Sequence, residues 1–197
     1  TLDQIHYVTN IQPITHLQLA QGKPEDDCRP DLHQLFMSLL GAVAYLAHTR
    51  VDILVFISAL QRHNQKPQII HVRRLNKLLS WIKQHPKKLT YRRFDASPGT
   101  QLVVISDAAF KKEPEDGYNL RGVVYVRCDG NMDSPKCIAH VLEWTCKAQR
   151  HVVRSTFAAE LHALVDAIEH GKLLFAMSEL LCGSMGPAPL QRLEELG

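Results

Sequence analysis

The chain has 197 residues, of which 45% are hydrophobic and 22% charged. This is an ordinary globular composition with room for one large or two small domains, and it excludes a disordered tail or a coiled coil. No run of about 18 apolar residues occurs, so we expect neither a membrane span nor a membrane partner. The chain begins at Thr1 without a basic segment followed by an apolar one, which argues against a secretory signal and for a fragment of a longer protein.

Cysteine and histidine residues are scattered along the chain. The five cysteines include no Cys-x-x-Cys pair, and the eleven histidines form no His-x3-His cluster. This spacing fits neither a disulfide framework nor a common zinc site. Unpaired cysteines are typical of a reducing compartment, so we expect an intracellular protein, cytoplasmic or nuclear.

The formal charge of +3 is distributed unevenly. Residues 1–30 carry two basic and four acidic groups, residues 31–100 carry eleven and three, and residues 101–197 carry ten and thirteen. Between Arg62 and Arg93 lie ten basic residues, both ends included, and no Asp or Glu. Such a stretch is typical of a segment that binds a polyanion, although a solvated helix face has the same composition.

The first half of the chain is predicted to be mainly helical. Residues 1–30 show a weak hairpin-like alternation followed by a polar, acidic stretch, and we predict an N-terminal segment and linker there. Apolar residues at helical spacing follow from Asp31, again over 53–60, and a third time over 67–85. These patterns predict a helical unit over residues 31–90.

The predicted helix 67–85, bounded by two prolines, has an apolar side and a basic side. Its apolar residues follow a 3-4-3 spacing: Val72, Leu75, Leu79 and Ile82. A basic side with an aromatic residue could lie along a phosphate backbone and stack on a base or sugar. Equally, the tryptophan could be buried against a neighbouring helix. The candidate nucleic-acid-binding residues are Arg62, Lys66, Arg73, Arg74, Lys77, Trp81, Lys83, Lys87, Lys88, Arg92 and Arg93.

The second half of the chain has a strand-like pattern. Residues 102–105 form a short apolar run that is typical of a buried strand and ends at Ser106-Asp107. Residues 123–127 and 137–144 are two further strand candidates, joined by turn residues as in an antiparallel hairpin.

A final helix is predicted to begin near Ser155, which can cap it, and to continue to Gly183. Residues 91–183 are thus predicted as a β-β-β-α domain, and residues 184–197 as a tail. The fold class expected for the whole chain is α/β (α+β).

Two carboxylates are the candidate catalytic and metal-binding residues, Asp107 and Glu160. A carboxylate at the end of a buried strand is costly unless it is paired or bound to a cation. At about 100° per residue, Glu160 lies at the edge of the apolar side of its helix, whereas Asp166 lies opposite and is expected to point into water. The apolar side, predicted to pack on the sheet, consists of Phe157, Leu161, Leu164, Val165 and Ile168.

Two converging carboxylates predict a site for Mg²⁺ or Mn²⁺. Two such ions can activate a water and stabilise the leaving oxygen in phosphodiester cleavage. The alternatives are an aspartate that caps a turn with a glutamate in a salt bridge, or a small phosphatase, for which no phosphate-cradling glycine-rich loop is present.

Five short blocks resemble the Pol polyprotein of copia-type LTR retrotransposons. FMSLLGAVAYLAHTRVDI over residues 36–53 is similar to the family's Leu-x-Gly-x4-Tyr-Leu-Ala-x-Thr-Arg-Pro-Asp-Ile block, and residues 71–82 resemble the helix that follows it. Ser106-Asp107-Ala108 matches the start of the family's RNase H domain. WTCKAQ at 144–149 and STFAAEL at 155–161 resemble Trp-x-x-Lys-x-Gln and Ser-Ser-x-x-Ala-Glu-Tyr.

This resemblance covers about residues 31–182, from the end of reverse transcriptase to the start of RNase H. It implies that Asp107 and Glu160 correspond to the first two metal-binding carboxylates of RNase H. It also implies that residues 31–90 are the thumb-like region that grips template and primer. The partners it implies are an RNA–DNA hybrid or other nucleic acid and the remainder of the Pol polyprotein.

The sequence also departs from the family. Val51 replaces a proline, and residues 109–110 replace an Asp-Trp pair. The third RNase H carboxylate belongs to a strand after the long helix, whereas the chain beyond Gly183 is rich in glycine and proline and then has a helical pattern. The polymerase Tyr-x-Asp-Asp motif is absent, since the acidic pair at 26–27 lacks the tyrosine.

Three functional hypotheses follow. The first is a reverse transcriptase–RNase H fragment whose family activity is Mg²⁺-dependent hydrolysis of RNA in RNA–DNA hybrids, with this endonuclease activity expected to be weak or absent in this chain. The second is a non-catalytic module that binds nucleic acid through the basic helix 67–85. The third is a decayed retroelement fragment, poorly folded and without activity.

Overall fold

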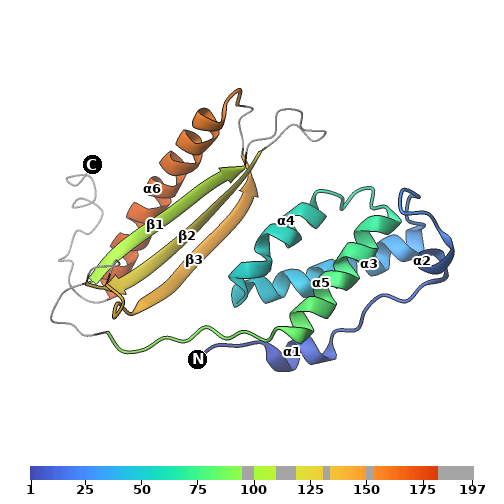
Figure 1. Ribbon diagram of the computed structural model, residues 1–197, viewed down its shortest axis with the longest axis horizontal. Helices are drawn as coiled ribbons and strands as arrows, with labels where there is room; N and C mark the ends of the chain where they lie inside the picture. The colour runs from blue at the N-terminus through green and yellow to red at the C-terminus, as the bar shows by residue number, and fades with distance from the viewer. Residues whose placement is uncertain (95–99, 110–118, 131–133, 150–152, 182–197) are drawn as a thin grey trace. The chain divides into compact units, whose positions relative to one another are not determined.

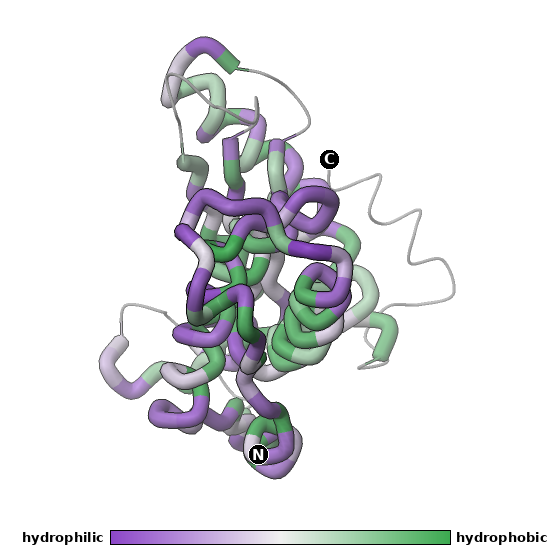
Figure 2. The backbone as a smooth tube through the Cα atoms, turned by 90° about the vertical axis from the view of Figure 1, so that its right-hand side faces the viewer, coloured by the Kyte–Doolittle hydropathy of each residue, from purple (hydrophilic) through white to green (hydrophobic). Residues whose placement is uncertain are grey.

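The computed structural model forms two compact units, Thr1–Tyr91 (unit 1) and Arg92–Gly197 (unit 2). Each unit is described by itself (Figure 1). Hydrophobic and hydrophilic residues alternate along the backbone in Figure 2, as amphipathic elements require. The structure describes residues 1–94, 100–109, 119–130, 134–149 and 153–181.

Unit 1 is helical. The N-terminal alternation indicated a hairpin, but the segment forms short helices, so this prediction was wrong. Three longer helices follow where helical patterns were predicted. Its helices are α1 (Ile5–Asn10), α2 (Leu17–Gln21), α3 (Pro30–Tyr45), α4 (Leu54–Gln61) and α5 (Ile69–Gln84), with 3₁₀ turns at Leu46–His48 and Val51–Ile53.

The ends of the long helices follow from local sequence. α3 begins with Pro30 at its first position and carries Asp31 in its first turn, both favourable at a helix N-terminus. At the start of α5, His71 Nδ1 accepts a hydrogen bond of 2.9 Å from the Gln68 backbone N–H. α5 ends two residues before Pro86, which cannot continue a helix. The predicted helix 67–85 is therefore confirmed to within two residues.

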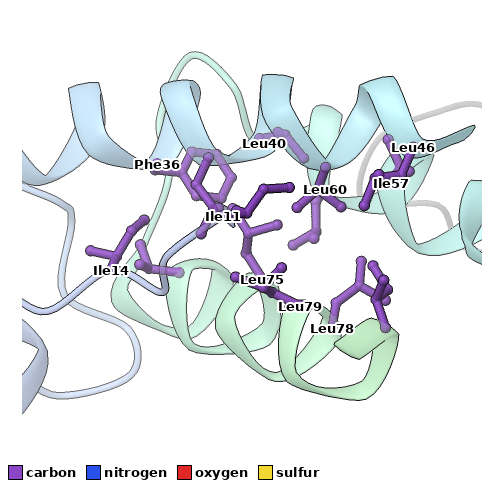
Figure 3. Close-up of a cluster of buried hydrophobic side chains, with 14 of the residues drawn as sticks. Ile11, Ile14, Phe36, Leu40, Leu46, Ile57, Leu60, Leu75, Leu78 and Leu79 are labelled. Carbon is purple, nitrogen blue, oxygen red and sulfur yellow. The ribbon is translucent and has the colours of Figure 1, made fainter. Parts of the chain in front are cut away.

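A continuous hydrophobic core holds unit 1 together (Figure 3). It joins one side of α3, α4 and α5 to the chain around Ile11 and Ile14. The predicted stripe of α5 is confirmed, because its four residues are at most 1% exposed. The N-terminal segment is also fixed by Asn76, whose side chain exchanges hydrogen bonds of 2.9 and 2.8 Å with the Ile14 backbone.

The described part of unit 2 contains an antiparallel three-stranded sheet with one helix on a face. The strands are β1 (Thr100–Ala109), β2 (Leu120–Asp129) and β3 (Ala139–Ala148), in the order β1-β2-β3. The helix α6 (Thr156–Leu181) lies along the sheet (Figure 1). The predicted cap is confirmed, since Ser155 Oγ accepts a hydrogen bond of 3.1 Å from the Ala158 N–H. The strand and helix order β-β-β-α is as predicted, and the α+β class is confirmed.

The side of α6 that packs on the sheet is not the predicted one. Ala159, Ala163 and Ala167 are at most 1% exposed and contact residues of the strands. α6 approaches β1 so closely that a Cβ on Gly171 would lie 3.0 Å from Val104 Cγ2. The predicted packing residues are exposed instead: Phe157 by 75%, Leu161 by 48%, Leu164 by 44%, Val165 by 46% and Ile168 by 45%.

The physical reason is that small side chains allow a helix to lie close to a sheet, where its backbone excludes water. The spacing of large apolar residues alone predicted that the side of α6 with the bulkier residues packs on the sheet. The same error affects Asp166, which we expected to point into water. Because α6 is rotated relative to the prediction, Asp166 faces β2 and forms an ion pair with Arg121.

Candidate nucleic-acid interface and carboxylate site

The solvent-facing side of α5 carries three basic residues, Arg73, Arg74 and Lys77, which we name the α5 basic face. All three are exposed, and the sequence of α5 contains no Asp or Glu. The opposite side of the helix is buried in the core of unit 1, so the backbone that carries these cations is held in place. Charges on neighbouring turns of a helix that is already held in place can contact successive phosphates with little further loss of conformational entropy.

Several of the other predicted contact residues have partners inside unit 1. Lys66, Lys87 and Lys88 form ion pairs with Asp27, Asp52 and Asp3 at 3.0, 3.0 and 3.7 Å. The three lysines are 55–79% exposed, but Asp52 is only 24% exposed and also accepts hydrogen bonds from Arg50. The pairs of Lys66 and Lys88 are thus the exposed kind that contributes only about 0–1 kcal/mol. Lys66 and Lys88 can therefore exchange a carboxylate for a phosphate.

Arg73 has a structural role within the α5 basic face. Its Nη2 donates hydrogen bonds to the backbone carbonyls of Leu19 at 2.8 Å and Gly22 at 3.0 Å. Arg62 also interacts within the chain, and Lys83 is exposed on another side of α5. Arg92 and Arg93 are exposed and belong to unit 2.

Trp81 packs inside unit 1. Its ring stacks on His85 with centroids 4.7 Å apart, and the guanidinium carbon of Arg50 lies 5.5 Å from its centroid. The ring also packs against the core. Its contacts match the alternative of burial against neighbours rather than a free platform for a base.

Arg50 and Asp52 form a buried polar cluster that the sequence analysis did not identify. Arg50 is 4% exposed, and its Nε and Nη2 each donate a hydrogen bond of 2.9 Å to Asp52. Burial acts to raise the pKa of Asp52, but hydrogen bonds from Arg50 and Lys87 outweigh it and hold that pKa below its ordinary value. The cluster borders a cavity of about 210 Å³ that Lys83 and Lys87 also line. An Arg-x-Asp spacing between two helices is the only sequence signal for it.

Asp107 lies two residues before the end of β1, and it is exposed. Its carboxylate therefore does not bear the cost of burial that made it a candidate. Ala108 packs under α6 against Ala159 and Ala163. Because successive side chains of a strand point to opposite faces, Asp107 lies on the face of the sheet away from α6.

Glu160 is half-buried on α6, next to Ala159. The backbones carrying Glu160 and Asp107 are therefore neighbours, since Ala159 and Ala108 share one hydrophobic cluster. Strand alternation nevertheless directs the Asp107 side chain to the other face of the sheet. In the part of the chain that the structure describes, no three His, Cys, Asp or Glu residues are grouped to hold a metal.

A second polar cluster in unit 2 lines a groove of about 410 Å³ between α6 and the strands. Glu143 Oε1 lies 3.1 Å from His170 Nε2, and the Tyr125 hydroxyl donates a hydrogen bond of 3.3 Å to the Ala167 carbonyl. Burial and the charge of Glu143 raise the pKa of Tyr125. No sequence signal pointed to this cluster, because its members come from three separate elements.

No helix in the described part is long and apolar enough to cross a membrane.

Comparisons with known proteins do not identify the chain. No family model, curated protein or solved structure matches the chain.

Proposed function

We propose that unit 1 binds nucleic acid through the α5 basic face, as the thumb-like part of a retroelement reverse transcriptase–RNase H polyprotein. The observation that supports this most directly is a rigid helix with a fully buried apolar side and an exposed side bearing cations and no acid. RNA–DNA hybrid is the ligand that the family resemblance favours.

Charge supports a polyanion over a neutral partner. Residues 62–93 contain ten basic and no acidic groups. The ion pairs of Lys66 and Lys88 are exposed and weak, so phosphates can replace their carboxylates. Binding of this kind releases counterions and weakens steeply as salt rises.

The test is fluorescence anisotropy of a labelled RNA–DNA hybrid with the Arg74→Ser/Lys77→Ser variant. Arg73 is left unchanged, because it also holds the Leu19–Gly22 backbone. We expect affinity at low salt to fall about 3- to 30-fold, as two phosphate contacts are lost.

The matched control is Lys23→Ser/Lys136→Ser, which removes two exposed charges outside α5. It should change affinity less than twofold. Equal losses in both double variants would mean that only net charge matters and would refute the α5 basic face as the site.

A second candidate function is Mg²⁺- or Mn²⁺-dependent hydrolysis of the hybrid, with Asp107 and Glu160 as metal ligands. The contact of Ala108 with Ala159 favours it, because it makes neighbours of the segments that carry both carboxylates. Asp107 faces away from α6, so we expect little or no cleavage. Robust cleavage that disappears in Asp107→Asn would contradict this expectation and establish the hydrolytic function.

A further inference from the structure

The outer side of α6 carries a row of five large apolar side chains, which we name the α6 stripe: Phe157, Leu161, Leu164, Val165 and Ile168. We infer that the α6 stripe is the contact surface between two copies of this chain, paired helix against helix. This inference is independent of nucleic-acid binding, which is assigned to unit 1.

Exposure of the α6 stripe is its first support. Its residues are 44–75% exposed, while the alanines on the other side of α6 make the contacts with the sheet. The largest contiguous apolar patch on a monomer, usually a few hundred Å², is often a functional surface. The second half of α6 exposes four further large apolar residues, Leu173, Met177, Leu180 and Leu181, whereas α3 exposes Leu35, Met37 and Tyr45, and α4 exposes Val55 and Phe56.

Spacing indicates that the partner is a helix. Phe157, Leu161, Leu164 and Ile168 follow a 4-3-4 pattern, the repeat of a helix–helix seam. α6 is 26 residues long, about 39 Å, and the α6 stripe covers its first half.

Charge argues against the main alternative partners. α6 contains four acidic residues and a single Lys172 as its only Lys or Arg. Helices that lie on anionic membranes, and surfaces that bind nucleic acid, are instead rich in Lys and Arg. A protein surface is therefore the partner whose chemistry fits.

A second copy fits because two-fold symmetry presents the same surface on both sides, so the partner needs no other apolar helix. Five side chains that are about half exposed leave on the order of 450 Å² per copy, or about 900 Å² for a pair. This is below the roughly 1,200–2,000 Å² of standard stable interfaces and in the range of weak, transient ones. We therefore expect a weak dimer with a dissociation constant of about 1–100 μM.

Sedimentation equilibrium of the intact chain from about 1 to 300 μM tests the inference. We expect a monomer–dimer equilibrium whose dissociation constant rises at least about tenfold in Leu164→Glu/Ile168→Glu. The matched control is Val55→Glu/Phe56→Glu, which places two charges on exposed apolar positions of α4 and should leave the equilibrium unchanged. Far-UV and near-UV circular dichroism verify folding, and Phe157→Ser/Leu161→Ser is the second variant if the first does not fold.

Three results would overturn the inference. One is a chain that stays monomeric throughout this range. Another is an oligomer that the α6 stripe variants do not weaken. The third is a monomer in which the thiol introduced by Leu164→Cys resists alkylation, because another part of the same chain would then cover the stripe.

Discussion

The two units bury apolar surface in different ways. Unit 1 has one continuous core in which eighteen described residues are at most 9% exposed. The described part of unit 2 has two small clusters, Ala108 with Ala159 and Ala163, and Val123 with Tyr125 and Ala167. Five of its large apolar side chains, those of the α6 stripe, are instead exposed on the outside of α6. Since buried apolar area is the main favourable term in folding, unit 1 should be the more stable unit, and unit 2 should depend more on its sheet and on further contacts.

The largest expected difference lies in the core of unit 1. Phe36 is fully buried there, so Phe36→Ala should lower the free energy of unfolding by about 3–5 kcal/mol. Leu164→Ala in unit 2 should cost less than about 0.5 kcal/mol, because Leu164 is 44% exposed. Urea unfolding followed by Trp81 and Trp144 fluorescence, one tryptophan in each unit, separates the two effects. A cost below about 1 kcal/mol for Phe36→Ala would break the comparison.

Acid should weaken unit 1 through His71, which is 5% exposed and stacks on His63 with ring centroids 3.7 Å apart. Burial, together with the charges of His63 and Arg74, lowers its pKa from 6.5 to about 4. The folded state thus favours neutral His71, and this stability is fully present above about pH 6.5. It is lost as pH falls towards 4, by roughly 2–3 kcal/mol.

The measurement is the urea midpoint of unit 1 between about pH 7 and 4, read from Trp81 in a Trp144→Phe background. His71→Gln should flatten the curve over this window, because its side chain does not titrate. The lowered pKa of Asp52 acts below its unfolded value of 3.8 and so outside the window. A slope that His71→Gln leaves unchanged would assign the acid sensitivity to other groups.

Two helical glycines sharpen the comparison further. Gly171 of α6 lies against β1, where an added Cβ would come within 3.0 Å of Val104 Cγ2, whereas Gly41 of α3 has open space around it. Gly171→Leu should therefore destabilise unit 2 by about 1–3 kcal/mol. Gly41→Ala should be neutral or stabilise unit 1 by up to about 1 kcal/mol. Thermal unfolding of both variants checks this, and equal effects would mean that α6 does not approach the sheet closely.

Sequence periodicity predicted the elements better than it predicted their contacts. The α5 stripe and its proline boundaries were predictable because large residues at helical spacing fill the core of a helical unit. The rotation of α6 was not, because both of its sides are apolar and only packing showed that the small side chains lie on the sheet. The face on which Asp107 lies was not predictable either, because it depends on which face of the sheet α6 covers, and Ala108 rather than Asp107 packs under that helix.

Polar contacts between residues far apart in the sequence limited how much of the candidate site could be predicted. The Glu143–His170 pair and the Lys87–Asp52 pair depend on three-dimensional proximity, which residue types alone do not encode. Arg50 and Asp52 are only two residues apart, but the burial of Arg50 also depends on the fold. Trp81 shows the same limit, since its aromatic character fitted both base stacking and packing. By contrast, the α5 basic face was predictable, because exposure of charged residues opposite an apolar stripe follows from helix geometry.

The central claim is that unit 1, through α5, carries the nucleic-acid contact. Its most direct test is nuclear magnetic resonance of the ¹⁵N-labelled chain titrated with an unlabelled RNA–DNA hybrid. We predict that amide shift changes concentrate around Arg74 and Lys77 and fade as salt is raised. Shift changes confined to unit 2, or none in α5 at low salt, would contradict the account.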